Sequence, residues 1–181
     1  MKKSLPAAWS NGQWIWLDLN ENRYIGGGFE RDSRLQALQA LAGARLRSVI
    51  YREKPLIPPL HIVGHFVRSS RRAKKFSKLR IVDQLAALEN SSKQPPNNHS
   101  VETLCWYYQY LRNLRVRRPL CLEDSLACAF FLRRYITGVS FRIGVKQPPF
   151  MAHAWVQVGE LIANDTKPVV ETYSEILRLD L

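Results

Sequence analysis

Residues 121–166 read CLEDSLACAFFLRRYITGVSFRIGVKQPPFMAHAWVQVGELIANDT, and they join a helical pattern to a run of strand-like patterns. The first part predicts a helix that starts near Pro119 and stops near Gly138. The second part predicts two or three strands, VSFRIGV, MAHAWVQV and LIANDT. Helices followed by strands predict an α+β domain in which the helices pack on an antiparallel sheet.

Upstream of this stretch, QWIWLDLNENRYIGGG predicts a β-hairpin at residues 13–28. Its strands are expected at 13–19 and 23–25, joined by the turn-prone Asn20-Glu21-Asn22 and followed by three glycines. The next segment, residues 34–50, has leucines at helical spacing and predicts an amphipathic helix that ends near Gly43 or soon after.

The middle of the chain is expected to be helical and basic. EKPLIPPL, residues 53–60, has three prolines in five positions and cannot continue a helix, so we place a domain boundary near residue 58. A helical pattern then covers residues 60–89, followed by a polar linker at 90–100. VETLCWYYQYLRNLR, residues 101–115, predicts a helix rich in aromatic residues.

The net charge is large and unevenly distributed. The 181 residues include 27 Lys and Arg against 15 Asp and Glu, a formal charge of +12, and residues 61–99 alone hold 8 basic and 2 acidic residues. This excess favours an acidic partner, either a nucleic acid or an acidic polypeptide, and charge alone does not choose between them. As a solvated helix face, the basic run at 68–80 needs no partner at all.

Several functional classes lack their signals. No apolar run approaches the roughly eighteen residues of a membrane span, and the basic N-terminus has no apolar segment of a signal peptide, so we expect a cytoplasmic protein. Gly26-Gly27-Gly28 lacks the Lys and Ser or Thr of a phosphate-binding loop. His61 and His65 stand four residues apart but have no third ligand at suitable spacing, so we expect no metal site.

Cys121, His153 and Asp165 form the strongest candidate for chemistry. Cys121 is expected in the first turn of its helix, just after two arginines, and both features favour a thiolate. His153 lies in a strand among small residues and Asp165 follows at the next strand, so one domain holds a nucleophile, a base and an orienting acid. The alternative is that Cys121 and His153 are packing residues, which is what we expect of Cys105 and Cys128.

The turn after the histidine strand gives this hypothesis a geometric test. A three-residue loop, Val158-Gly159-Glu160, places His153 directly across from Asp165 on one face of an antiparallel pair. A two-residue Gly159-Glu160 turn instead places Asp165 across from Ala154, on the other face of the sheet. The catalytic hypothesis therefore requires the three-residue loop or a bulge.

The block CLEDSLACAFFLRRYITGVSFRIGVKQPPFMAHAWVQVGELIAND resembles the core of the lasso-peptide maturation B proteins. These are leader peptidases of the transglutaminase-like (papain-like) cysteine protease superfamily, and the likeness covers roughly residues 115–170. It rests on the CLxxSLA helix start, the RIGV strand and the AHAWV strand with a later Asp. The resemblance implies that Cys121 is the nucleophile, His153 the general base and Asp165 the orienting acid.

The front of the chain is similar, less specifically, to the small winged-helix-like domain that recognises the leader in such proteins. WIWLDLNENRYI, residues 14–25, is the matching portion, and EKPLIPPL interrupts the pattern of that domain's third helix. The resemblance implies that the leader adds to the sheet as a further strand, at the edge formed by Arg23, Tyr24, Ile25, Gly26 and Gly27. We therefore expect a recognition domain at 1–58 and a protease domain at 59–181.

These observations lead to one functional hypothesis and two alternatives. The resemblance implies a cysteine peptidase that removes the leader from a lasso-peptide precursor and works with an ATP-dependent macrolactam-forming cyclase. We expect no cofactor in this chain, any ATP dependence to come through the cyclase, and neither a membrane nor a nucleic acid as partner. The alternatives are a basic nucleic-acid-binding protein without catalysis, and a thiol acyltransferase or transglutaminase that uses the same three residues.

Overall fold

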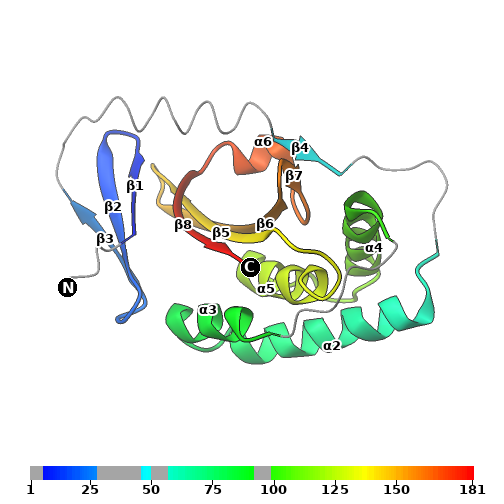
Figure 1. Ribbon diagram of the computed structural model, residues 1–181. Helices are drawn as coiled ribbons and strands as arrows, with labels where there is room; N and C mark the ends of the chain where they lie inside the picture. Colours follow the sequence, from blue (N-terminus) through cyan, green and yellow to red (C-terminus); the bar gives the residue numbers. More distant parts are fainter. Residues whose placement is uncertain (1–5, 28–45, 50–56, 92–98) are drawn as a thin grey trace.

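The protein consists of two β-sheets and a set of helices (Figure 1). The computed structural model describes residues 6–27, 46–49, 57–91 and 99–181. The smaller sheet has the strand order β1-β2-β3 and the larger one β4-β7-β6-β5-β8. In Figure 1, helix α5 (Cys121–Leu132) lies between the larger sheet and helix α2 (Leu60–Phe76). The expected α+β class, with helices against an antiparallel sheet, is confirmed.

The smaller sheet contains the predicted hairpin. Strand β2 (Gln13–Asp18) pairs antiparallel with β3 (Arg23–Gly27), and the Asp18 carboxylate accepts hydrogen bonds from backbone N–H groups in the turn between them. A further strand, β1 (Ala7–Ser10), pairs with the other side of β2. Because β3 pairs only with β2 among the described residues, its outer edge is unpaired there. The winged-helix-like architecture stays a prediction, since the helix expected from residue 34 to about Gly43 lies outside the described residues.

The larger sheet carries the C-terminal half of the chain. Its long strands are β5 (Val139–Lys146), β6 (Met151–Val158) and β8 (Ser174–Asp180), with the two-residue β7 (Leu161–Ile162) beyond β6. The sequence did not predict β8, an edge strand with charged residues. It also predicted a third strand over 161–166, whereas β7 ends at Ile162, and the one-turn helix α6 (Lys167–Val170) follows.

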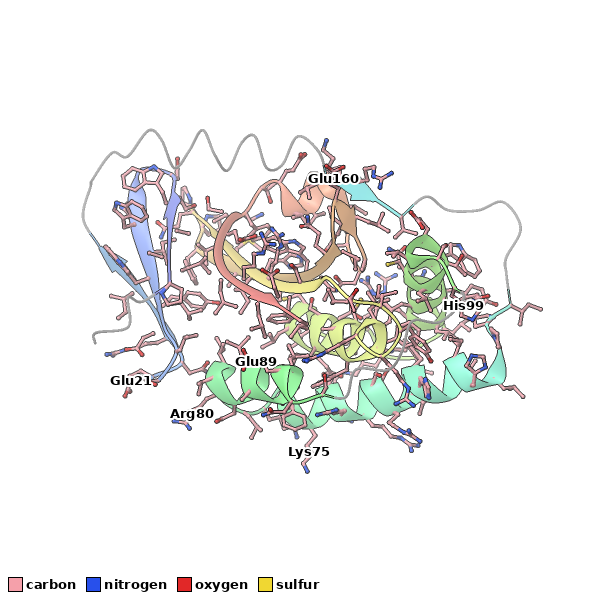
Figure 2. All side chains as sticks on the ribbon, viewed as in Figure 1. Glu21, Lys75, Arg80, Glu89, His99 and Glu160 are labelled. Carbon is pink, nitrogen blue, oxygen red and sulfur yellow. The ribbon has the colours of Figure 1, made fainter. Side chains whose placement is uncertain are left out.

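The edge of the larger sheet beyond β7 is formed by a segment from the N-terminal third of the chain. Strand β4 (Arg47–Ser48) pairs parallel with β7, and the Arg47 N–H donates to the Glu160 carbonyl at 2.8 Å. Figure 2 shows Glu160 beside this strand. The predicted boundary near residue 58 therefore follows a strand that already belongs to the larger sheet.

The helical pattern predicted at 60–89 forms two helices, not one. The helix is interrupted at residues 77–80, and this break separates α2 from α3 (Ile81–Glu89). Gln84 is 2% exposed, and its side-chain amide donates to the Leu79 carbonyl at 2.8 Å, which satisfies a backbone acceptor that the break would otherwise leave unpaired. The aromatic helix α4 (Val101–Asn113) forms as predicted and is capped by Ser100, whose hydroxyl accepts from the Thr103 N–H.

The smaller sheet packs onto the rest of the molecule and shares its core. Ala8, Ile15 and Leu17 are buried in the same hydrophobic cluster as residues of α5 and β5. At the β2–β3 turn, the Asn22 side-chain oxygen accepts a hydrogen bond from the Ile81 N–H at the start of α3, and Figure 2 shows Glu21 next to this helix. This contact ties the β2–β3 turn to the start of α3.

Candidate active site

Cys121 is the first residue of α5 and is partly exposed. A hydrogen bond with His153 lowers the pKa of its thiol; burial opposes this, and hydrogen bonds from the backbone of Ala154 and Leu122 lower the pKa further. The sequence predicted this helix start and a favoured thiolate. The groups that lower the pKa of the thiol lie on the neighbouring strand and in the first turn of α5 itself. The sequence had instead pointed to the arginines that precede the helix.

His153 lies on β6 with its ring between Cys121 and Asp165. Its Nε2–H donates to Asp165 Oδ2 at 2.6 Å. The hydrogen bond with Asp165, followed by that with Cys121, raises the pKa of His153 from 6.5 to about 9. Burial works to raise the pKa of Asp165, but hydrogen bonds from His153 and the Thr166 N–H lower it overall. The structure therefore brings the three predicted residues into one constellation.

The route by which Asp165 reaches His153 differs from the predicted one. Gln157 pairs with Ile162 and Val158 with Leu161, so the turn is the two-residue Gly159-Glu160 turn, with Gly159 at a φ of +57°. In a regular ladder this register would place Asp165 on the wrong face of the sheet. The three-residue loop is wrong, and the condition for the triad is met because the ladder itself ends early.

The ladder ends at Ala163 because two amide side chains replace its next hydrogen bonds. Ala163 N–H still donates to the Val156 carbonyl at 2.9 Å, but the Ala163 carbonyl accepts from Gln109 Nε2 on α4, also at 2.9 Å. The Val156 N–H in turn donates to Asn164 Oδ1 at 2.8 Å. The chain is thus free to bend over residues 163–165, and Asp165 turns toward His153 while Ala163 and Val156 keep hydrogen-bond partners.

Asn164 also ties this bend to α5. Its Nδ2 donates to Asp124 Oδ2 and to Ser125 Oγ, each at 3.0 Å, and Ser125 Oγ donates to the Ala154 carbonyl at 2.8 Å. Asn164, Asp124 and Ser125 are all at most 3% exposed. This buried network joins the helix that carries Cys121 to the strand that carries His153 and to the bend that carries Asp165.

Asp124 is the most heavily bonded residue of the network. It accepts a hydrogen bond from Tyr108 OH at 2.9 Å, and Arg112 Nε lies 3.4 Å and Arg115 3.8 Å from its carboxylate oxygens. Arg112 also donates to the Asn164 carbonyl. The sequence did not indicate this role of Asp124, because its partners lie on α4 and in the 163–165 bend, far away along the chain.

Two aromatic rings hold the imidazole of His153. Tyr173 stacks on it with ring centroids 5.1 Å apart, and Trp155 with centroids 6.3 Å apart. Gly144, across from His153 on β5, makes room for them, since an added Cβ would lie 2.9 Å from both Trp155 and Tyr173. The glycine of the RIGV motif is thus required by the packing of the rings around His153.

Replacing Gly144 with alanine is expected to lower the free energy of unfolding by about 1–3 kcal/mol, because the new methyl group would lie 2.9 Å from both the Trp155 ring and the Cβ of Tyr173. Chemical denaturation monitored by tryptophan fluorescence measures this. Gly64 on α2 has open space where a Cβ would lie, so Gly64→Ala is the matched control and should not destabilise the fold. Equal stability of the Gly144→Ala variant and the wild type would contradict the packing described.

The smaller sheet contributes one residue to the surroundings of Cys121. Tyr24 on β3 packs against the main core and against Phe150 in the β5–β6 loop, with ring centroids 5.2 Å apart. Burial, and secondly the charge of the nearby Cys121, raise the pKa of Tyr24 to about 12. Tyr24 was predicted as part of the edge that binds the leader, and nothing in the sequence indicated that it also lies beside the cysteine.

Comparison with protein families matches residues 65–178 to the Transglutaminase-like superfamily. The chain belongs to the transglutaminase-like superfamily. The match covers more than half of the 181 residues and includes Cys121, His153 and Asp165. No curated protein matches the chain significantly, and no solved structure does. The chain therefore has a transglutaminase-like domain, with the fold of a cysteine peptidase or acyltransferase.

The other cysteines of this transglutaminase-like protein are packing residues, as predicted. Cys105 and Cys128 are fully buried. Burial raises the pKa of Cys105 to about 12 and that of Cys128 well above its usual value. Within the described parts of the chain, no cluster of three metal-ligating side chains occurs, and no helix is both long and apolar enough to cross a membrane.

The raised pKa of His153 gives the transglutaminase-like site a testable protonation state. We expect the His153 ring to stay protonated until about pH 9. Because the folded-state pKa exceeds the ordinary 6.5, the stability from this ion pair is fully present below pH 6.5 and is lost as the pH rises through about 9. NMR titration of the ring protons measures this. Asp165→Asn should lower this pKa more than Cys121→Ala does, and a wild-type pKa near 6.5 would contradict the geometry.

Proposed function

We propose that the protein is a cysteine peptidase that removes the leader peptide from a ribosomally synthesised lasso-peptide precursor. The observation that carries the proposal is the constellation of an activated Cys121 thiol, His153 with a raised pKa, and Asp165 at 2.6 Å from the imidazole. Membership of the transglutaminase-like superfamily supports thiol chemistry on an acyl group. The resemblance of the motifs to lasso-peptide B proteins supports the choice of substrate.

The proposed mechanism follows from these positions. The Cys121 thiolate attacks the scissile carbonyl, and the His153 imidazolium donates its proton to the leaving amine. Asp165 holds Nε2–H of His153, which leaves Nδ1 as the nitrogen that exchanges protons with the thiol and the substrate. A water activated by His153 then hydrolyses the thioester and frees the leader. The backbone N–H of Cys121, at a helix start where N–H groups have no partner within the helix, is the proposed oxyanion donor.

The leader is proposed to bind along the edge of β3, residues Arg23, Tyr24, Ile25, Gly26 and Gly27. Among the described residues this edge pairs with no other strand, and an extended peptide can add to such an edge through backbone hydrogen bonds. Arg23 and Ile25 are exposed along it, and Tyr24 lies near Cys121. A leader held there would pass its scissile bond toward the cysteine. The proposed partner for the next step is an ATP-dependent macrolactam-forming cyclase.

Tyr24 links the two parts of this proposal and yields a prediction. We expect Tyr24→Ala to lower kcat/KM for the precursor roughly tenfold, because it removes a ring that packs on Phe150 beside the cysteine. Tyr24→Phe keeps that ring and should stay close to the wild type. Steady-state cleavage assays on the three proteins measure this, with circular dichroism to verify folding. Wild-type kinetics in the Tyr24→Ala variant would show that the Tyr24 ring does not contact the substrate.

The alternative, acyl transfer to an amine, uses the same three residues and the same superfamily fold. The two chemistries differ only in what attacks the thioester. Mass analysis of the products, with and without an added primary amine, separates them: hydrolysis adds one water across the cleaved bond, whereas transfer adds the amine. An amide product formed in preference to the free acid would replace the peptidase proposal.

A further inference from the structure

A polar pocket lies at the end of α5 opposite to Cys121. It has a volume of about 90 Å³ and opens between α2, Ser91 shortly after α3 and the end of α5. Its lining side chains are His65, Arg68, Ser69, Arg72, Ser91 and Arg134, with Phe130 at its base. Because α5 rises about 1.5 Å per residue over its 12 residues, this pocket and the cysteine are roughly 18 Å apart along the helix.

The pocket is strongly cationic. It is lined by three arginines and a histidine, and no Asp or Glu is among its described lining residues. Burial, followed by the charges of Arg134, Arg68 and His61, lowers the pKa of His65. The positive groups are thus close enough to act on one another, and an anion at their centre would relieve this repulsion.

Two nearby arginines have a structural role. Arg72 donates to the Ala87 carbonyl at 3.2 Å and lies over the Phe130 ring at 4.3 Å. Arg133, just outside the pocket, donates to the carbonyls of Leu88 and Glu89. These bonds satisfy acceptors at the C-terminal end of α3. Capping of that helix therefore explains why Arg72 and Arg133 lie here, but it does not explain the other arginines of the pocket.

Arg68 and Arg134 have no such role. Neither forms a hydrogen bond or ion pair with the described part of the protein, and Arg134 Nε is buried there without a partner. A buried donor left unpaired costs free energy, so a group that accepts from it would stabilise this arrangement. His65 shares Nδ1 with Tyr135 OH, which leaves its Nε2 for a ligand.

We propose that this pocket is a binding site for a small tetrahedral oxyanion of the size of phosphate, held by Arg68, Arg134 and His65. Guanidinium groups bind phosphate oxygens through paired N–H donors, and the Ser69 hydroxyl at the pocket wall adds a neutral donor. The volume suits such an ion, because it would otherwise hold only a few waters. The site is separate from the catalytic constellation, and the inference does not depend on the proposed peptidase activity.

Titration of the full chain with inorganic phosphate, against chloride at equal ionic strength, tests the proposal. We expect saturable binding by calorimetry, and in NMR spectra a rise in the pKa of His65 when phosphate binds. Besides phosphate, the groups that face His65 are Arg68, Arg134, His61 and Tyr135, and they do not change between the two salts. Arg68→Gln changes an exposed residue and should weaken phosphate binding about tenfold or more, with no loss of folding.

Arg134→Met is expected to abolish binding while keeping the aliphatic packing of the side chain, and its folding is checked by circular dichroism. Arg117→Gln removes an exposed arginine outside the pocket and should bind phosphate as the wild type does. The proposal is overturned if chloride shifts His65 as phosphate does, or if Arg68→Gln binds phosphate with wild-type affinity.

Discussion

Replacing Cys121 with alanine is expected to abolish cleavage of a precursor peptide, with a fall in kcat of roughly 10⁴-fold or more. Loss is this large because nucleophile and base act as one unit, and a methyl group can neither attack the carbonyl nor form the thiolate–imidazolium pair. Single-turnover assays followed by mass analysis measure the residual rate. The fold should survive, because Cys121 is a partly exposed residue at a helix start.

The other two cysteines supply matched controls for this experiment. Cys105→Ala and Cys128→Ala change the same atoms at buried positions, and both variants should cleave at close to the wild-type rate. Iodoacetamide should modify Cys121 alone in the native protein, since its pKa is lowered while burial raises those of the other two. Cleavage that persists in Cys121→Ala at the wild-type rate would refute the assignment of the nucleophile.

Replacing Asp124 with alanine is expected to give the largest loss of stability, about 3–5 kcal/mol. The carboxylate is 3% exposed and lies near two arginines, and its removal leaves their charges and the Asn164 amide without this acceptor. Denaturant unfolding at fixed pH measures the change. Because the network also supports the 163–165 bend, the variant should lose part of the high pKa of His153, which NMR titration reports separately.

Asp83→Ala is the matched control for this prediction. Asp83 pairs with Arg80 at 3.1 Å, but both side chains are exposed on α3, and such surface pairs contribute less than about 1 kcal/mol. A loss at Asp124 no larger than that at Asp83 would show that the buried network does not hold the site together.

The sequence predicted α5, β5 and β6 because each has a strong local pattern. It did not predict where the β6–β7 ladder ends, since this depends on the side chains of Gln109 and Asn164 and not on hydrophobic period. The two-residue turn forms, and the triad forms with it because the ladder does not continue regularly past Ala163. An Asn directly before the candidate Asp was the available signal, since Asn side chains often replace backbone partners in bends.

Long-range contacts account for the other features that the sequence did not show. The break between α2 and α3 depends on Gln84, whose side-chain amide donates a hydrogen bond to the Leu79 carbonyl. The helical pattern around Gln84 does not indicate this bond. The approach of Tyr24 to Cys121 depends on how the smaller sheet docks through Ile15, Leu17 and Asn22. Neither follows from periodicity, because each joins elements that lie far apart in the chain.

We propose that this transglutaminase-like protein hydrolyses a peptide bond of a precursor through Cys121. The most direct measurement incubates the wild-type protein with a lasso-peptide precursor in water enriched in heavy oxygen and determines the masses of the products. We predict two fragments, a leader that carries heavy oxygen in its new carboxylate and a core peptide with a free amino terminus. An intact precursor, or a leader fragment that has gained an amine without heavy oxygen, would contradict the account.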